Sequence, residues 1–358
     1  MQTTTALSPG VIKEHIDAQL AAYFEKRRVE SVALGASYAQ LWKSLETLVM
    51  AGGKRFRPYM VVLAHQAYAP EEAIQPILPA AAAQELVHQA VLIHDDIIDR
   101  DTIRYGIDNI TGQYNTLYAP FITDTNERHH MATSAALLAG DILLSDAHHF
   151  MHALKKPETM VQRASDILST AVFEVVGGEL LDTEVSFLPP GSISPEIIAH
   201  YKTASYSFVS PLTMGAVLGG AGEKEVATLT ELSLHLGIGY QLRDDLIGMF
   251  GDSAVTGKST TTDITEGKRT FLVERFEACA TKTQKASFAA AFHNQDATPQ
   301  EIAACKQALI DSGAKAAVEA EITKHEQAAR ACIDTLTIQP KAKELFHGLT
   351  DKCLSREA

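Results

Sequence analysis

Apolar residues recur every three to four positions along most of the chain, a spacing that predicts amphipathic helices. The first helix is predicted to begin at Ser8 and Pro9, a capping residue followed by proline in the first turn, and to continue through Ile12, Ile16 and Leu20. No run alternates apolar and polar residues long enough to predict a strand. Further helices are predicted over residues 38–51, 55–68, 76–104, 132–155, 159–186, 195–219, 224–250, 269–290, 299–310 and 313–336. The pattern therefore predicts an all-α fold.

Length and charge narrow the class of protein. The chain has 358 residues, of which 46% are hydrophobic and 21% are charged, as is typical of globular proteins. The 31 basic and 44 acidic residues give a net charge of −13, which argues against non-specific binding to nucleic acid or to an anionic membrane. The length would fit two domains of about 150 residues or one large helical domain. We expect a single all-helical domain over residues 1–358.

From the N-terminus, the apolar runs and the cysteines, we expect a cytoplasmic protein without stable membrane insertion. The longest apolar runs are well short of the ~20 residues that a membrane-spanning helix needs. Residues 1–10 have neither the charged region nor the apolar region of a signal peptide. The cysteines are too far apart in the sequence for a zinc or redox motif, and we expect four reduced thiols at Cys279, Cys305, Cys332 and Cys353.

Two polar segments are predicted to be long loops. Residues 108–128 contain Pro120, and residues 251–268 are rich in glycine, serine, threonine and aspartate. Loops of this length within a compact domain are often functional, so both segments are candidates for the edge of a binding site.

The strongest chemical signal is an acidic cluster within an apolar helix. Asp95 and Asp99 are four residues apart, so a helix places them on one face, with Asp96 about 100° around the axis. The flanking residues are mostly valine, leucine and isoleucine, so the carboxylates lose hydration and require cations or a metal ion. Hard divalent ions suit such oxygen ligands, and Mg²⁺ usually takes phosphate oxygens as well. The alternative is a solvated acidic patch at a helix end.

A second acidic pair, Asp244 and Asp245, lies in a similar apolar setting. Gly248 stands where an aspartate would have matched the first cluster. An acidic pair on a helix is commonly a capping or salt-bridge site, so this pair indicates metal binding only in combination with the first cluster.

A basic pair follows two glycines at the start of a predicted helix. Lys54 and Arg57 are three residues apart and share a face after Gly52 and Gly53. Backbone amides, a helix N-terminus and two cations form a good anion site, although a basic cap over carbonyls or carboxylates is equally compatible with the pattern. Other basic residues predicted near turns or loops are Arg104, Lys202, Lys258 and Lys268.

In combination, these motifs resemble those of the trans (E-type) isoprenyl diphosphate synthases over about residues 50–272. The matching motifs are Gly53-Lys54-x-x-Arg57-Pro58, His88, Asp95-Asp96-x-x-Asp99, Arg104 with Gly106, Lys202-Thr203, Gln241-x-x-Asp244-Asp245, Gly257-Lys258 and Gly267-Lys268. The resemblance implies antiparallel helices around a deep central cavity and a homodimer. It also implies that an allylic diphosphate condenses with isopentenyl diphosphate, using three Mg²⁺ ions and releasing diphosphate.

The same resemblance implies a role for each matching residue. The principal Mg²⁺ ligands would be Asp95, Asp99 and Asp244, supported by Asp96 and Asp245. Isopentenyl diphosphate would be bound by Lys54, Arg57 and His88. The allylic diphosphate would be surrounded by Arg104, Lys202, Thr203, Gln241, Lys258 and Lys268. We expect the five aspartates and Lys202 to be the catalytic residues, with the two acidic clusters facing one another across the cavity.

Two positions depart from the family pattern. Tyr105 replaces an arginine that would normally contact isopentenyl diphosphate, so we expect weaker binding of that substrate. Gly248 replaces the last aspartate of the second cluster, a position less central to metal binding in the family.

Product length is predicted from the residues that precede the first aspartate. In this family, bulky residues four and five positions before it tend to block chain growth. Here these residues are Val91 and Ala90, neither of which is aromatic, so we predict a product of C20 or longer. Residues on a later helix could limit the product instead, namely His148, His149, Phe150 or Met151.

Two other functions fit parts of the pattern. A class I terpene cyclase shares the ionisation step, but it needs no second diphosphate pocket such as Lys54, Arg57 and His88 would form. A non-catalytic partner subunit of a heteromeric synthase is suggested only by Tyr105 and Gly248.

Overall fold

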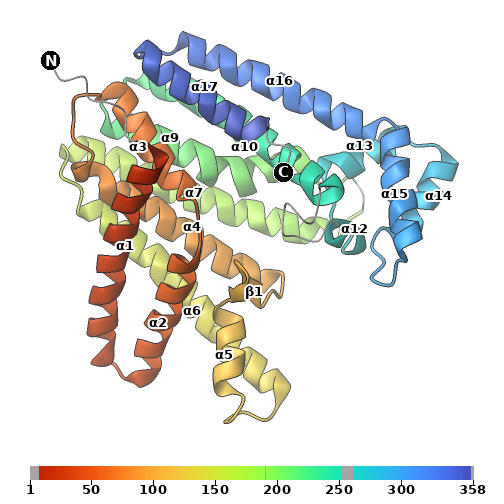
Figure 1. Ribbon diagram of the computed structural model, residues 1–358, viewed down its shortest axis with the longest axis horizontal. Coiled ribbons are helices and arrows are strands. Elements are labelled where there is room, and N and C mark those ends of the chain that lie inside the picture. Colours follow the sequence, from red (N-terminus) through yellow and green to blue (C-terminus); the bar gives the residue numbers. More distant parts are fainter. Residues whose placement is uncertain (1–7, 190, 252–260, 356–358) are drawn as a thin grey trace. The chain divides into compact units, whose positions relative to one another are not determined.

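The computed structural model describes residues 8–189, 191–251 and 261–355, and it confirms the all-α fold (Figure 1). The first half of the chain forms α1 (Pro9–Val32), α2 (Ala36–Ala51), α3 (Phe56–Tyr68), η1 (Gln75–Ile77), α4 (Leu78–Ile98), α5 (Ile110–Tyr118), α6 (Thr125–His152) and α7 (Glu158–Val185). The second half forms α8 (Pro195–Ile198), η2 (Ala199–Val209), α9 (Ser210–Leu218), α10 (Glu223–Phe250), α12 (Thr262–Thr265), α13 (Phe271–Cys279), α14 (Lys282–Ala291), α15 (Pro299–Asp311), α16 (Ala314–Thr335) and α17 (Pro340–Leu354).

The structure corrects the segment after the first acidic cluster. The helix predicted over residues 76–104 ends at Ile98, and the chain then forms a short antiparallel hairpin of β1 (Ile103–Arg104) and β2 (Ile107–Asp108). The predicted loop over residues 108–128 contains α5, whose first turn is capped because Asn109 accepts a hydrogen bond of 2.9 Å from the Gly112 amide.

Other boundaries also differ from the prediction. The helix predicted over residues 195–219 is three consecutive helices, of which η2 is a π-helix. The helix predicted over 269–290 divides into α13 and α14, because Thr281 starts a new helix with a capping box. Of the predicted loop over 251–268, residues 252–260 lie outside the described residues, and α12 lies beyond them.

The described chain forms two compact units. The first unit contains the residues up to Val172 together with Ser210–Gly222, and the second contains Phe173–Val209 and the residues from Glu223 onwards. In the first unit, α4 packs against α6, and α3 packs against α9. In the second unit, α10 packs against both η2 and α16, and α17 runs beside α16 (Figure 1).

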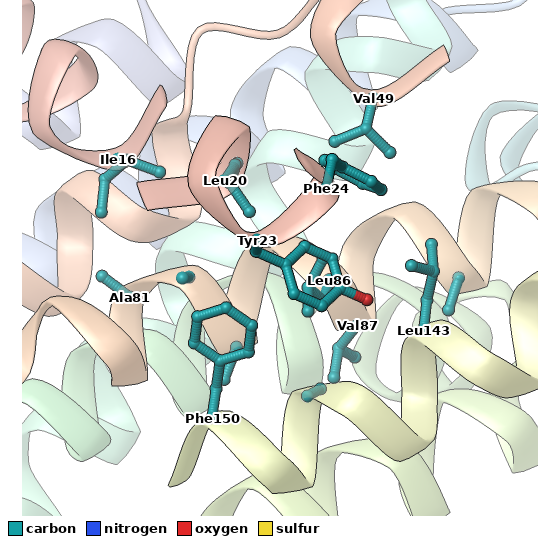
Figure 2. Packing of buried hydrophobic residues seen from close by; sticks show 14 of the residues in the cluster. Ile16, Leu20, Tyr23, Phe24, Val49, Ala81, Leu86, Val87, Leu143 and Phe150 are labelled. Atoms are coloured by element: carbon teal, nitrogen blue, oxygen red, sulfur yellow. The ribbon is translucent and has the colours of Figure 1, made fainter. Parts of the chain in front are cut away.

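Aromatic residues from three helices form part of the core of the first unit. The rings of Tyr23 and Phe150 meet edge to face with centroids 5.2 Å apart (Figure 2). Tyr23 also meets Trp42 edge to face at 5.9 Å. The Tyr23 hydroxyl donates a 2.7 Å hydrogen bond to Asp146, whose carboxylate also accepts a 2.8 Å bond from Arg27. Two side chains of α1 thus pair with this buried acid of α6.

All four cysteines lie in the described residues and are free thiols. Among the described residues, we find no helix whose length and apolar character would let it cross a bilayer.

Candidate active site

The first acidic cluster lies in the last turn of α4. Asp99 caps this helix, and its amide donates a 2.8 Å hydrogen bond to the Asp95 carbonyl. The Asp96 side chain is 3% exposed and that of Asp95 is 18% exposed, whereas Asp99 is exposed. The cluster is therefore half-buried rather than fully buried. A helix C-terminus carries a partial negative charge, so three carboxylates at this end require nearby positive charge.

Asp96 binds neighbouring side chains with both of its carboxylate oxygens. Its Oδ1 accepts a 2.8 Å hydrogen bond from Nε of Arg104, and its Oδ2 accepts a 2.9 Å bond from the Asn109 amide. Burial raises the pKa of Asp96, while these two partners act in the opposite direction. Asp96 thus holds the β1–β2 hairpin against α4, and Asp95 and Asp99 remain nearer to solvent.

A group of cations lies near this cluster in the first unit. Lys54 is exposed and Arg57 is partly buried, at the start of α3. Burial lowers the pKa of His88 well below its ordinary value, and the positive charges of Arg57 and Arg104 lower it further. His88 is therefore neutral at neutral pH, and it lies within electrostatic range of both arginines.

Arg55, between the two predicted cations, anchors this loop. It is 2% exposed, has a positive φ of 49°, and donates 2.7 Å hydrogen bonds to both Asp17 and Glu85. A third bond of 2.9 Å reaches the Val49 carbonyl at the end of α2. No motif in the sequence marks Arg55, because its role depends on acids that are distant in the sequence.

Tyr105 closes the same region from the turn between β1 and β2. Its ring lies against Gly52, where a Cβ would be only 2.9 Å from ring atom Cγ. Burial raises the pKa of Tyr105. A hydrogen bond with the Gln89 side chain acts in the opposite direction, as expected when the amide donates to the phenol oxygen. Gln89 also donates a 2.9 Å bond to Glu85, so Tyr105 is linked to the acid that binds Arg55.

In the second unit, four predicted residues form one chain of contacts. The Thr203 hydroxyl donates a 2.7 Å hydrogen bond to Gln241, and the Gln241 amide donates a 3.0 Å bond to Asp245. The Lys268 ammonium lies 3.5 Å from the same carboxylate. The structure thus brings together four of the candidate site residues, Thr203, Gln241, Asp245 and Lys268, and Asp244 is adjacent to Asp245 on α10.

The two charged members of this chain perturb one another. Burial raises the pKa of Asp245 to about 6, and Lys268 and the bond from Gln241 act in the opposite direction. Asp245 in turn is the main cause of a raised pKa at Lys268, which stays fully charged at neutral pH. A carboxylate whose pKa is raised by burial beside a specific charged partner is typical of a functional site.

Lys202 lies on the π-helix η2 and is paired with acids on α7. Its ammonium is 3.0 Å from Glu179 and 2.6 Å from Asp182. Neither acid could be predicted from the sequence, because neither belongs to a recognisable motif. π-Helical turns are rare and occur frequently at functional sites, which is consistent with the predicted role of Lys202. The other predicted lysine, Lys258, lies outside the described residues.

The acidic side chains determine which metal ion the site could bind. Among residues 8–189, 191–251 and 261–355, no three histidine, cysteine, aspartate or glutamate side chains converge closely enough to bind a metal ion. Each acidic cluster nevertheless offers carboxylate oxygens within one helical turn, at Asp95 and Asp99 and at Asp244. Mg²⁺ is usually bound in this way, by one or two carboxylates with water and substrate phosphates, so the donor chemistry fits this ion.

Comparisons with known proteins agree on one family. Residues 39–309 match the polyprenyl synthetase family. The geranylgeranyl diphosphate synthase of Methanosarcina mazei is 30% identical over 344 residues, covering 96% of this chain and 95% of that protein. A short chain isoprenyl diphosphate synthase of Methanocaldococcus jannaschii is 31% identical over 262 residues, covering 73% of this chain and 70% of that protein.

A solved structure gives the same result. The geranylgeranyl pyrophosphate synthase of Corynebacterium glutamicum, complexed with isoprenyl diphosphate and magnesium, superposes with a TM-score of 0.89 at 27% identity. The match covers 98% of this chain and all of that one. With the motifs, the fold and these relatives in agreement, the chain belongs to the polyprenyl synthetase family and is a trans-prenyltransferase.

Proposed function

We propose that this enzyme is an Mg²⁺-dependent synthase that condenses an allylic diphosphate with isopentenyl diphosphate, and that its product is a trans-prenyl diphosphate of C20 or longer. The observation that carries this proposal is the pairing, within the first unit, of a half-buried acidic helix end with a separate group of cations. The acids Asp95 and Asp99 suit metal-bound diphosphate, whereas Lys54 and Arg57 suit a second diphosphate without metal.

The first step is loss of diphosphate from the allylic substrate. We propose that Asp95, Asp99 and Asp244 would hold Mg²⁺, three ions in all, and that the bound ions would supply positive charge to this leaving group. Lys202 and Lys268 contribute fixed positive charge to the same group. Asp96 and Asp245 act through their neighbours, since both carboxylates are engaged by side chains of the protein.

The second substrate is bound at the start of α3. Lys54 and Arg57 pair with the diphosphate of isopentenyl diphosphate, and the neutral imidazole of His88 donates a hydrogen bond without adding charge. The double bond of isopentenyl diphosphate attacks the allylic cation. The released diphosphate is a suitable base for the proton that the condensed product then loses. The allylic cation is proposed to lie in an apolar cavity that excludes water from it.

Product length is proposed to depend on α4. Ala90 is fully buried, and Val91 is partly buried against the core of the first unit, one turn before Asp95. Neither side chain is bulky enough to close the cavity after three isoprene units. Phe150 packs on Tyr23, so its ring is already engaged in the core. The name of the Methanosarcina mazei relative, a geranylgeranyl diphosphate synthase, is consistent with a C20 product.

We further propose a single catalytic domain that acts as a cytoplasmic homodimer, by analogy with the family. Size-exclusion chromatography with light scattering would test the dimer: a monomeric mass at working concentration would contradict it.

One experiment tests the proposed reaction. The purified chain is incubated with labelled isopentenyl diphosphate, Mg²⁺ and a C5, C10 or C15 allylic primer, and the products are separated by chain length. We expect labelled C20 or longer product that disappears when Mg²⁺ is chelated. Cyclic hydrocarbon without label would indicate a terpene cyclase, no product would indicate a non-catalytic partner subunit, and exclusive C10 or C15 product would contradict the predicted length.

A further inference from the structure

Two histidines meet where α10 packs against α16 in the second unit. Nδ1 of His235 lies 3.0 Å from Nδ1 of His325, and the two ring centroids are 5.2 Å apart. His325 is buried, whereas His235 is partly exposed to solvent. The pair is separate from the candidate active site, because nine residues, or about 13.5 Å of helix, lie between His235 and Asp244.

A glycine on α10 allows α16 to approach this closely. A Cβ on Gly239, one turn after His235, would lie 3.3 Å from Cβ of His325 and 2.8 Å from Cδ2 of Leu354. A side chain at position 239 would therefore push at least one of these neighbours away from α10. The absence of a side chain at this position keeps the two helices close enough for the imidazole rings to meet.

Both imidazoles are neutral at neutral pH. Burial lowers the pKa of His235 and, together with the neighbouring ring, the pKa of His325. Two neutral rings that meet through Nδ1 share one hydrogen, which one nitrogen donates and the other accepts. Carboxylates lie within electrostatic range on both helices, since Glu231 and Glu321 oppose these shifts, while the ammonium of Lys324 adds to the shift of His325. Two neutral nitrogen ligands with two carboxylates and one ammonium ion nearby favour a divalent cation.

The spacing of the two nitrogens suits a single metal ion. Imidazole nitrogen binds Zn²⁺ at about 2.0–2.1 Å, so a tetrahedral ion holds two such nitrogens about 3.3–3.4 Å apart. The observed separation of 3.0 Å is about 0.3–0.4 Å shorter, a difference that small rotations of the two rings remove. Among the described residues, no third histidine, cysteine, aspartate or glutamate converges with the pair, so water would complete the coordination.

We propose that His235 and His325 bind a transition-metal ion of the Zn²⁺ class, which cross-links α10 to α16. Imidazole suits such ions, whereas Mg²⁺ takes oxygen ligands, so this site differs in chemistry from the Mg²⁺ sites proposed for catalysis. When the ion binds, the hydrogen of the donating Nδ1 is lost and Nε2 of the same ring gains one, so both Nδ1 lone pairs face the ion. The inference is independent of the proposed prenyl transfer, because it uses no residue of the candidate active site.

Calorimetric titration with Zn²⁺ tests the site, with excess Mg²⁺ present to occupy the acidic clusters. We expect the wild-type chain to bind Zn²⁺, and His235→Asn and His325→Asn each to weaken this binding at least about tenfold, since losing a direct ligand costs no less than losing a group that orients one. Asparagine keeps a hydrogen-bonding atom near the position of Nδ1 but has no imidazole. The matched control is His347→Asn, a partly buried histidine of α17, which should bind Zn²⁺ as the wild type does.

Thermal unfolding gives a second readout in the same proteins. An ion that binds only the folded state raises the unfolding temperature, so Zn²⁺ should raise that of the wild type and of His347→Asn by more than that of either site variant. Circular dichroism checks that each variant is folded before Zn²⁺ is added. Absence of Zn²⁺ binding by the wild type in excess Mg²⁺ would overturn the inference, and so would equal Zn²⁺ affinity in the wild type and the folded site variants.

Discussion

Adjacent glycines on α7 provide a sensitive test of how Lys202 is positioned. A Cβ on Gly178 would lie 2.2 Å from the backbone nitrogen of Lys202 and 2.7 Å from its Cα, whereas a Cβ on Gly177 has no atom within 4 Å. Both positions are in the interior of the same helix. Alanine at either site gains about 1 kcal/mol of helix propensity over glycine, so the two substitutions differ only in what the new methyl group meets.

The expected magnitudes follow from this geometry. Gly177→Ala should raise the free energy of unfolding by up to about 1 kcal/mol. Gly178→Ala should lower it, because overpacking costs about 1–3 kcal/mol and the atoms in the way belong to the backbone. To relieve the contact, α7 and η2 must separate by about 1.2 Å, the difference between 2.2 Å and the 3.4 Å at which ordinary contact begins. A displacement of about 1 Å in a positioning group can reduce the rate by about 100-fold.

Urea unfolding and steady-state kinetics measure the two effects. Gly178→Ala should show a lower unfolding midpoint and a reduced kcat/KM for the allylic substrate, while Gly177→Ala should retain its kcat/KM and gain stability. Equal stability and equal activity in the two variants would refute the argument that close backbone contact at Gly178 sets the position of Lys202.

Four further predictions follow from individual residues. Arg55→Gln should lower the free energy of unfolding by about 3–5 kcal/mol, because it leaves the buried Glu85 carboxylate without its ion-pair partner. Arg28→Gln, which breaks an exposed pair with a 3.7 Å contact, should lower it by at most about 1 kcal/mol. Equal losses in urea unfolding would contradict this. Burial lowers the pKa of His65 to about 4, so the unfolded state binds more protons between pH 6.5 and 4, and stability should fall by about 3 kcal/mol across that window as the pH is lowered. His65→Leu should flatten this dependence in urea titrations at several pH values, and an unaltered slope would exclude His65 as its source. Tyr105→Arg should lower the KM for isopentenyl diphosphate about tenfold by adding a charged hydrogen bond, and an unchanged or raised KM would count against that role. Val91→Phe should shorten the product toward C15 in chromatography, and an unchanged chain length would place the limiting residue elsewhere.

Long periodic helices were predictable from the sequence because each has an extended apolar face. The helix predicted over residues 224–250 is α10, Glu223–Phe250, and that predicted over 313–336 is α16, Ala314–Thr335. Short elements were not predictable, since the two-residue strands β1 and β2 leave no periodic signal. The nine-residue α5 was hidden by the polar residues around it, although Asn109 at its start is a typical capping residue.

The candidate site was predictable only where its residues belong to motifs. Gln241 and Asp245 lie four residues apart on α10, and their hydrogen bond follows from helix geometry. The partners of Arg55 and Lys202 come from other helices, and no spacing rule connects them in the sequence. The Asp263 carboxylate likewise lies against the Cα of Gly248 on α10, a contact that no spacing rule predicts across fifteen residues.

The π-helix η2 has a consequence for comparing this chain with its relatives. A π turn contains about one residue more than an α turn. The π-helix η2 therefore uses more residues than an α-helix of the same axial length would. Deleting one residue within Ala199–Val209 could convert a wide turn into a regular one while the neighbouring helices stay in register. Such a deletion would rotate Lys202 away from Asp182. An alignment gap in this short stretch would therefore mark a change in the direction of a functional side chain, in a region where gaps are usually dismissed as neutral.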